Sequence, residues 1–250
     1  LVVAAGLGAN GNTITLSKAL AEEIGPFATP LSPAAFAAAI RARAAAGRPR
    51  VTLAVVFPFS SHNYLLRHWL AAGGLDPDRD LRLTVVPPSL CAQRLAEGAI
   101  DGFCAGEPWG SQAAALGAGR VALATGDIWG NHPEKLLAIR AEAIGRDREP
   151  LIACTAAVIA AARWLDDPLN RDDAVRILAN RAFPHLARET IALALEGRAG
   201  GVTHAHPICF RPATQPRRAE AAWWLGQMRR WGHLPGVADE ITLAPWADDS

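Results

Sequence analysis

Short runs of β-branched and other apolar residues alternate with helix-like stretches in the first half of the chain. The expected order is strand 51–57, helix 61–72, strand 81–86, helix 90–97 and strand 100–104. The first strand, VTLAVVF, is rich in β-branched residues, and the first helix ends at a Gly-Gly pair. This β-α-β-α-β order predicts a parallel sheet, with ligands bound at the carboxyl ends of its strands.

The second half of the chain is predicted to contain two more strands and then mostly helices. The strands are expected at 121–125 and 136–140. Helices should follow from about residue 151, broken at Asp166-Asp167-Pro168 and Phe183-Pro184, because proline interrupts a helix.

Two apolar features in this half predict packing rather than chemistry. The stretch 151–162 is shorter than the roughly 20 residues of a membrane span, so we expect a buried helix. A long helix opening at Pro216 carries Trp224, Met228 and Trp231 on one side, which is typical of a core stripe.

Charge and composition exclude several classes of function. The chain has 25 Lys and Arg against 24 Asp and Glu, without a run of like charges, so we expect no nucleic-acid partner. No G-x-S-x-G, H-E-x-x-H or phosphate-loop motif occurs, which argues against an enzyme. The cysteines form no C-x-x-C pair, so we expect neither a metal nor another cofactor, and four buried free thiols: Cys91, Cys104, Cys154 and Cys209.

Polar residues gather where the predicted strands end. Ser60, Ser61 and His62 follow the first strand and open a helix, where exposed amide groups favour an anion. A serine there can equally serve only as the helix cap, so both readings stay open. Pro87-Pro88-Ser89 and Gly106-Glu107-Pro108-Trp109 follow the next two strands.

Several of these segments resemble the nitrate- and bicarbonate-binding proteins of bacterial ABC transporters, a family that also includes cytoplasmic nitrate and nitrite sensors. The similar segments run in order from residues 11–17 to 227–232. They include PFSSHNY (58–64), GGLDPDRD (73–80), VPP (86–88), DGFCAGEPW (101–109) and HPEK (132–135).

The resemblance implies a type II periplasmic-binding-protein-like α/β fold, with two lobes of parallel-rich sheets joined by a hinge. We expect residues 1–20 and 106–250 in one lobe and residues 21–105 in the other. Leu1 falls well inside the family's pattern, which implies that about a third of the usual protein precedes it. A pocket Trp of the family has no counterpart in this sequence.

The resemblance also implies a ligand set. It places His62 and Lys135 against the anion, Pro88 nearby, and Asn12 and Thr13 at the lobe junction, and we include Ser61 at the helix start. The similar bicarbonate binders carry an acidic side chain, associated with calcium, where nitrate binders carry Lys. Because an ammonium group pairs directly with a monoanion, Lys135 favours nitrate or nitrite over bicarbonate.

Three alternatives stay open at this point. Glu107 is interpreted as part of an element that crosses between lobes rather than as a ligand, and His132 as either a loop hydrogen bond or a pocket contact. The expected role is capture of nitrate or nitrite for the membrane subunits of an ABC transporter, in the periplasm or anchored on the outer face of the membrane. The alternative is a cytoplasmic sensor that controls an antiterminator protein.

Overall fold

The computed structural model of the protein describes residues 1–210 and 217–234. Its strands are β1 (Val2–Gly6), β2 (Asn12–Ser17), β3 (Thr52–Val55), β4 (Arg82–Val85), β5 (Gly102–Gly106), β6 (Gly119–Ala124) and β7 (Leu136–Ile139). Its helices are α1 (Lys18–Ile24), α2 (Pro33–Ala45), α3 (Ser61–Ala72), α4 (Pro88–Ala96), α5 (Trp109–Ala115), α6 (Ala141–Arg146), α7 (Arg148–Asp166), α8 (Arg171–Arg181), α9 (Arg188–Leu195) and α10 (Arg218–Arg230). Short 3-10 turns cover Thr125–Asp127, Pro168–Asn170 and Ala199–Gly201.

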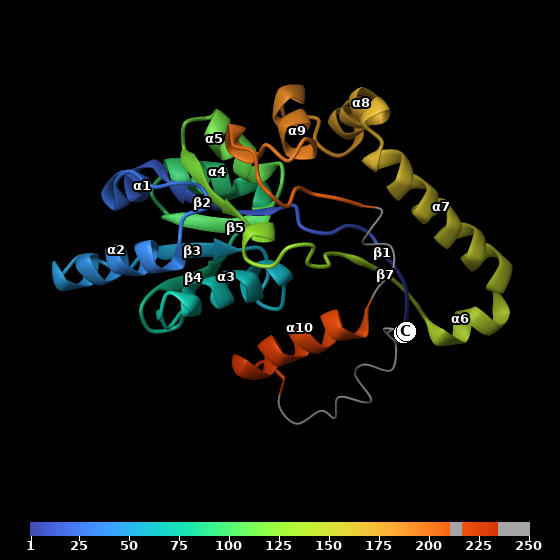
Figure 1. Ribbon diagram of the computed structural model, residues 1–250, viewed down its shortest axis with the longest axis horizontal. Helices are drawn as coiled ribbons and strands as arrows, with labels where there is room; N and C mark the ends of the chain where they lie inside the picture. The colour runs from blue at the N-terminus through green and yellow to red at the C-terminus, as the bar shows by residue number, and fades with distance from the viewer. Residues whose placement is uncertain (211–216, 235–250) are drawn as a thin grey trace.

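A five-stranded mixed sheet in the order β4-β3-β5-β2-β6 organises the first half of the chain (Figure 1). β3 pairs in parallel with both β4 and β5, so the predicted β-α-β-α-β unit is confirmed. β2 runs antiparallel between β5 and β6 and is buried at all six positions. β2 has strands on both sides and helices on both faces, so its polar residues, such as Thr13 and Thr15, are buried along with Ile14 and Leu16.

The sheet continues across the lobe boundaries that the sequence suggested. β2 and β6 fall in the segments 1–20 and 106–250, yet both belong to the same sheet as the strands of 21–105. The main sheet therefore takes strands from both predicted segments, and the division of the whole protein into two lobes stays a prediction.

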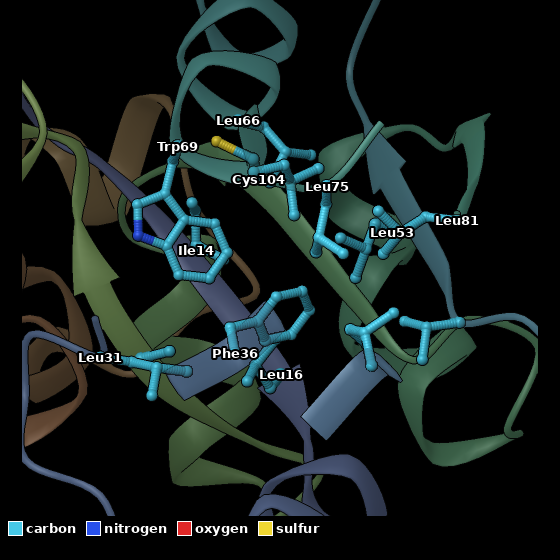
Figure 2. Packing of buried hydrophobic residues seen from close by; sticks show 14 of the residues in the cluster. Ile14, Leu16, Leu31, Phe36, Leu53, Leu66, Trp69, Leu75, Leu81 and Cys104 are labelled. Atoms are coloured by element: carbon cyan, nitrogen blue, oxygen red, sulfur yellow. The ribbon is translucent and has the colours of Figure 1, made fainter. Parts of the chain in front are cut away.

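Two hydrophobic clusters cover the two faces of the sheet. On one face, α2 and α3 pack against β2 and β3, with Phe36 and Trp69 at the centre and their rings 4.9 Å apart (Figure 2). On the other face, α4 and α5 pack against side chains of β3 and β5, including Ala54 and Phe103. Adjacent residues such as Phe103 and Cys104 point to opposite clusters, as the period of two in a strand requires.

The second sheet is a two-stranded antiparallel ribbon of β1 and β7. α6 and α7 extend away from the main sheet beside this ribbon (Figure 1). The prediction of a buried helix over 151–162 is wrong for this chain, since Ala162 is the only buried residue of α7 and Ile152 is 56% exposed. The apolar side of α7 faces a shallow groove that it shares with Val2, Ala4 and Ile139, and no described residue fills that groove.

The thiol prediction is confirmed only in part. All four cysteines are free, and Cys91 and Cys104 are buried, but Cys154 is exposed and Cys209 is partly exposed. Cys154 lies on the uncovered helix α7, which is why its apolar sequence context did not bury it.

α10 packs across α3 through aromatic contacts. The ring of Trp224 lies 6.5 Å from that of Tyr64, and Trp223 lies 4.5 Å from Trp129. The guanidinium of Arg67 stacks over Trp231 at 5.2 Å. The aromatic stripe therefore serves packing, as the sequence indicated, while its expected start at Pro216 lies outside the described residues.

Candidate functional site

The two serines that follow β3, Ser60 and Ser61, make different hydrogen bonds. Ser60 is the N-cap of α3, and its Oγ accepts a hydrogen bond from the amide of Asn63. Ser61 is the first helical residue, and its Oγ donates to Glu134 Oε1 at 2.6 Å. The cap interpretation thus holds for Ser60, while Ser61 reaches the segment before β7.

His62 lies beneath this contact and is 7% exposed. Its Nδ1 has no hydrogen-bond partner among the described residues. A methyl group placed on Gly106 would lie 3.9 Å from His62 Nε2 and 3.5 Å from Asn12 Oδ1, so the glycine leaves room between these two side chains. Burial lowers the pKa of His62, and the charge on Glu134 only partly opposes this effect, so the ring is neutral at pH 7.

Glu134 is the centre of the polar contacts at this site. Its Oε1 accepts hydrogen bonds from Asn12 Nδ2 at 2.5 Å and from Ser61, and its Oε2 lies 3.6 Å from Lys135 Nζ. Burial by itself would raise the pKa of this carboxyl group, but the charge that His62 carries when protonated, the hydrogen bond from Ser61 and the charge of Lys135 outweigh burial and lower the pKa. Glu134 therefore stays ionised in a largely buried position.

Lys135 stands at the rim of the site with its side chain 75% exposed. Its backbone carbonyl accepts a hydrogen bond from the amide of Leu7 at 2.8 Å, which fixes the main chain but not the long side chain. The ammonium group can therefore swing between Glu134 and a ligand.

A cavity of about 160 Å³, called the polar cavity below, lies between these segments. Its lining consists of Leu7, Gly8, Ala9, Asn10, Gly11, Asn12, Gly106, Glu107, Glu134, Lys135, Ile208 and Phe210. The strand ends of β2 and β5 thus meet the loop before β7 there, which agrees with the expectation that polar groups gather at one end of the sheet.

Ser61 and His62 neighbour Glu134 and Gly106 of this lining but are not part of it, and Thr13 and Pro88 also lie outside it. Thr13 is fully buried, and its Oγ1 donates to Glu107 Oε1 at 2.8 Å. Pro88 is the first residue of α4 and follows β4 after Val86 and Pro87. A direct contact of either residue with an anion stays a prediction.

Glu107 and His132 hold their own segments in place. Glu107 Oε2 accepts a hydrogen bond from the amide of Ser111 at 3.2 Å, and burial raises the pKa of this carboxyl group despite its hydrogen bonds from Ser111 and Thr13. His132 is fully buried, and its Nε2 lies 2.8 Å from Thr125 Oγ1. Of the two readings of His132, the loop hydrogen bond is the one present.

Glu134 is the residue that the sequence analysis missed. It stands in the HPEK segment directly before Lys135. The available signal was chemical: a donor-rich set of Asn12, Ser61 and Lys135 needs an acceptor to hold it when no ligand is bound.

The model of the NMT1-like family matches residues 1–179. The bicarbonate transport ATP-binding protein CmpC of Synechococcus elongatus is 34% identical over 230 residues, which cover 90% of this chain and 33% of that protein. The nitrate/nitrite binding protein NrtA of a Nostoc species is 32% identical over 209 residues, which cover 79% and 46%. The chain therefore spans about a third to a half of the length of these curated relatives.

A solved structure agrees with these matches. The crystal structure of the periplasmic nitrate-binding protein NrtA from Synechocystis aligns with a TM-score of 0.86 and 28% identity, covering 99% of this chain and 64% of that one. This alignment confirms the expected periplasmic-binding-protein-like α/β fold.

Proposed function

The chain belongs to the NMT1-like family, and on that basis we propose that it captures nitrate or nitrite as the solute-binding component of an ABC-type anion uptake system. Two of the relatives support the ligand class, because they are named as nitrate-binding proteins. The fold supports binding rather than catalysis as the basic activity, since those relatives are binding proteins.

One observation carries the proposal: the buried His62 has its Nε2 next to Gly106, which lines a small cavity that has Lys135 at its rim. Pockets for drug-sized molecules measure roughly 300–1,000 Å³, whereas this one measures about 160 Å³. The space suits a small oxyanion. The Lys135 ammonium and the His62 ring are groups that hydrogen-bond such an ion.

Lys135 also favours nitrate or nitrite over bicarbonate. A lysine at this position pairs with a monoanion directly, so no bridging metal is needed. The relatives include a bicarbonate transport protein as well as nitrate binders, so this choice rests on the side chain and not on overall similarity.

The proposed partners are the membrane subunits of the transporter, and the proposed location is the periplasm or the outer face of the membrane. The likeness to a periplasmic nitrate-binding protein supports both. Among the residues that the structure describes, no helix is both long and apolar enough to cross a membrane. The relatives compared above are named for transport or binding, which favours this role over that of a cytoplasmic sensor.

Calorimetric titration of the full-length protein with nitrate, nitrite, bicarbonate and sulfate tests the proposal. Nitrate or nitrite should bind more tightly than sulfate, with no requirement for calcium. Tighter binding of sulfate, or of bicarbonate only when calcium is present, would replace the proposed ligand.

A further inference from the structure

The polar cavity presents an unusual charge arrangement for a site that takes an anion. Two carboxyl groups, Glu107 and Glu134, line it, against one ammonium group, Lys135. Glu134 is the ionised one, and its side chain is only 10% exposed, so water does not screen it well. A monoanion that enters must therefore be accommodated beside a fixed negative charge.

The donors around Glu134 cannot simply turn to the ligand. Asn12 Nδ2 and Ser61 Oγ both donate to Glu134 Oε1. Removing them would leave a largely buried carboxylate with fewer hydrogen bonds, which is costly. Asn12 and Ser61 therefore position Glu134, and the candidates for direct contact with the anion are His62, Lys135 and the second N–H of Asn12.

His62 is the group that can change its charge. It is buried, its Nδ1 is unpartnered among the described residues, and its Nε2 faces the space above Gly106. The charges that act on it come from the segment before β7, namely Glu134, Lys135 and His132, while β2 contributes the uncharged Asn12 and the end of β5 contributes Glu107. Burial keeps the pKa of His62 low and the ring neutral.

We propose that this site binds its monoanion together with one proton, which His62 holds, and that Glu134 is the residue that sets this requirement. The inference rests on the proposed function. With Glu134 at −1, Lys135 at +1, the buried Glu107 protonated and His62 neutral, the charges of the site balance before an anion binds. A monoanion makes the sum negative, and one proton on His62 restores the balance while giving the ring two N–H donors.

The same charge arrangement selects against dianions. A second negative charge would need a second proton or cation, and the site offers no further basic side chain among the residues that line the polar cavity. Glu134 thereby acts as a specificity-determining residue, rejecting sulfate by repulsion rather than by size.

Calorimetry in buffers of different ionisation enthalpy tests proton uptake in the full-length protein. Nitrate binding near pH 7.5 should take up about one proton, and the Kd should rise by up to about tenfold per pH unit above neutrality, because ligand and proton affinities are reciprocally linked. Nitrate binding with no proton uptake would overturn this inference alone. Absence of nitrate, nitrite and bicarbonate binding at every pH would overturn the proposed function itself.

Glu134→Gln separates charge from structure, because glutamine keeps an oxygen that can accept from Asn12 and Ser61. Proton uptake should fall to well under half of the wild-type value, and the preference for nitrate over sulfate should shrink at least tenfold. A purely structural role for Glu134 would move neither quantity. Unchanged uptake in this variant would refute the proposal.

His62→Gln identifies the protonated group. Its residual nitrate binding should proceed without proton uptake, and if that binding is too weak to measure, the Glu134→Gln result decides. His68→Gln is the matched control, because His68 lies on the same helix with an unpartnered Nδ1 but packs against Trp223, away from the polar cavity. It should retain wild-type uptake. Uptake that survives in His62→Gln would place the proton on another group and overturn the assignment.

Discussion

Replacing Lys135 with methionine should separate ligand binding from folding more cleanly than any other change at the site. The chain contains only two lysines, Lys18 and Lys135, and their side chains are 74% and 75% exposed. Each lies near a glutamate, with Nζ to Oε distances of 3.9 Å for Lys18–Glu22 and 3.6 Å for Lys135–Glu134. Lys18→Met is therefore a closely matched control.

The expected magnitudes differ between the two properties. Exposed ion pairs contribute about 0–1 kcal/mol, so neither variant should lose more than about 1 kcal/mol of unfolding free energy. A charge-assisted hydrogen bond to the anion contributes about 1.5–3 kcal/mol, so Lys135→Met should weaken nitrate binding by roughly 10- to 150-fold. Lys135→Glu should weaken it further, because a second carboxylate then stands beside Glu134.

Urea denaturation and calorimetric nitrate titration of the three proteins provide the measurement. Lys18→Met should match the wild type in both. If Lys135→Met binds nitrate with the affinity of the wild type, Lys135 is a solvated surface residue and the assignment is wrong. If it loses affinity and stability in equal measure, the lysine acts through the fold instead.

Three further predictions address packing, pH and motion. Gly110→Ala should destabilise the protein by about 1–3 kcal/mol in urea denaturation, because its methyl group would lie too close to Thr13 Oγ1 and Glu107 Oε1. The control Gly226→Ala lies on the open side of α10 and should be neutral or slightly stabilising. Equal effects of the two substitutions would contradict the packing argument. The free energy of unfolding should fall as pH drops below about 6.5, because burial lowers the pKa of His62 and His132 in the folded protein and the unfolded chain then binds more protons. His62→Gln should therefore lose less stability than the wild type between about pH 7.5 and pH 5. An equal loss in both proteins would rule out His62 as a contributor. Small-angle scattering of the full-length protein should show a more compact particle with saturating nitrate, and an unchanged profile would refute closure of two lobes.

Local pattern predicted much of the fold, because the β-α-β-α-β unit is built from neighbouring segments. The helix 61–72 was predicted at its observed bounds, since both its start and its Gly-Gly stop lie in the sequence. β1 and β2 were not predicted as strands. Their pairing partners lie about 90 to 140 residues away, and each segment is only five or six residues long, so β-branched residues such as Thr13 and Ile14 were a weak signal on their own.

Burial was the harder property to predict. The residues of α7 are as apolar as those of a core helix, yet they are mostly exposed because no described segment covers them. The match to nitrate- and bicarbonate-binding relatives confirmed the resemblance and with it the fold. The site was predicted through that resemblance rather than through pattern. Glu134 was missed because its role depends on three donors from three separate segments.

The central position of β2 has a consequence for how the chain is made. β2 ends at Ser17, but its neighbours β5 and β6 begin only at Gly102 and Gly119. At roughly 5–20 residues per second, a ribosome needs roughly 4–17 s to supply the first of them. During that interval a strand with Ile14 and Leu16 exposed has both edges open, while the parallel strands β3 and β4 can already pair. β2 is therefore made before the rest of its sheet but is among the last of these strands to be placed, and its open edges can pair with other newly made chains until β5 and β6 arrive.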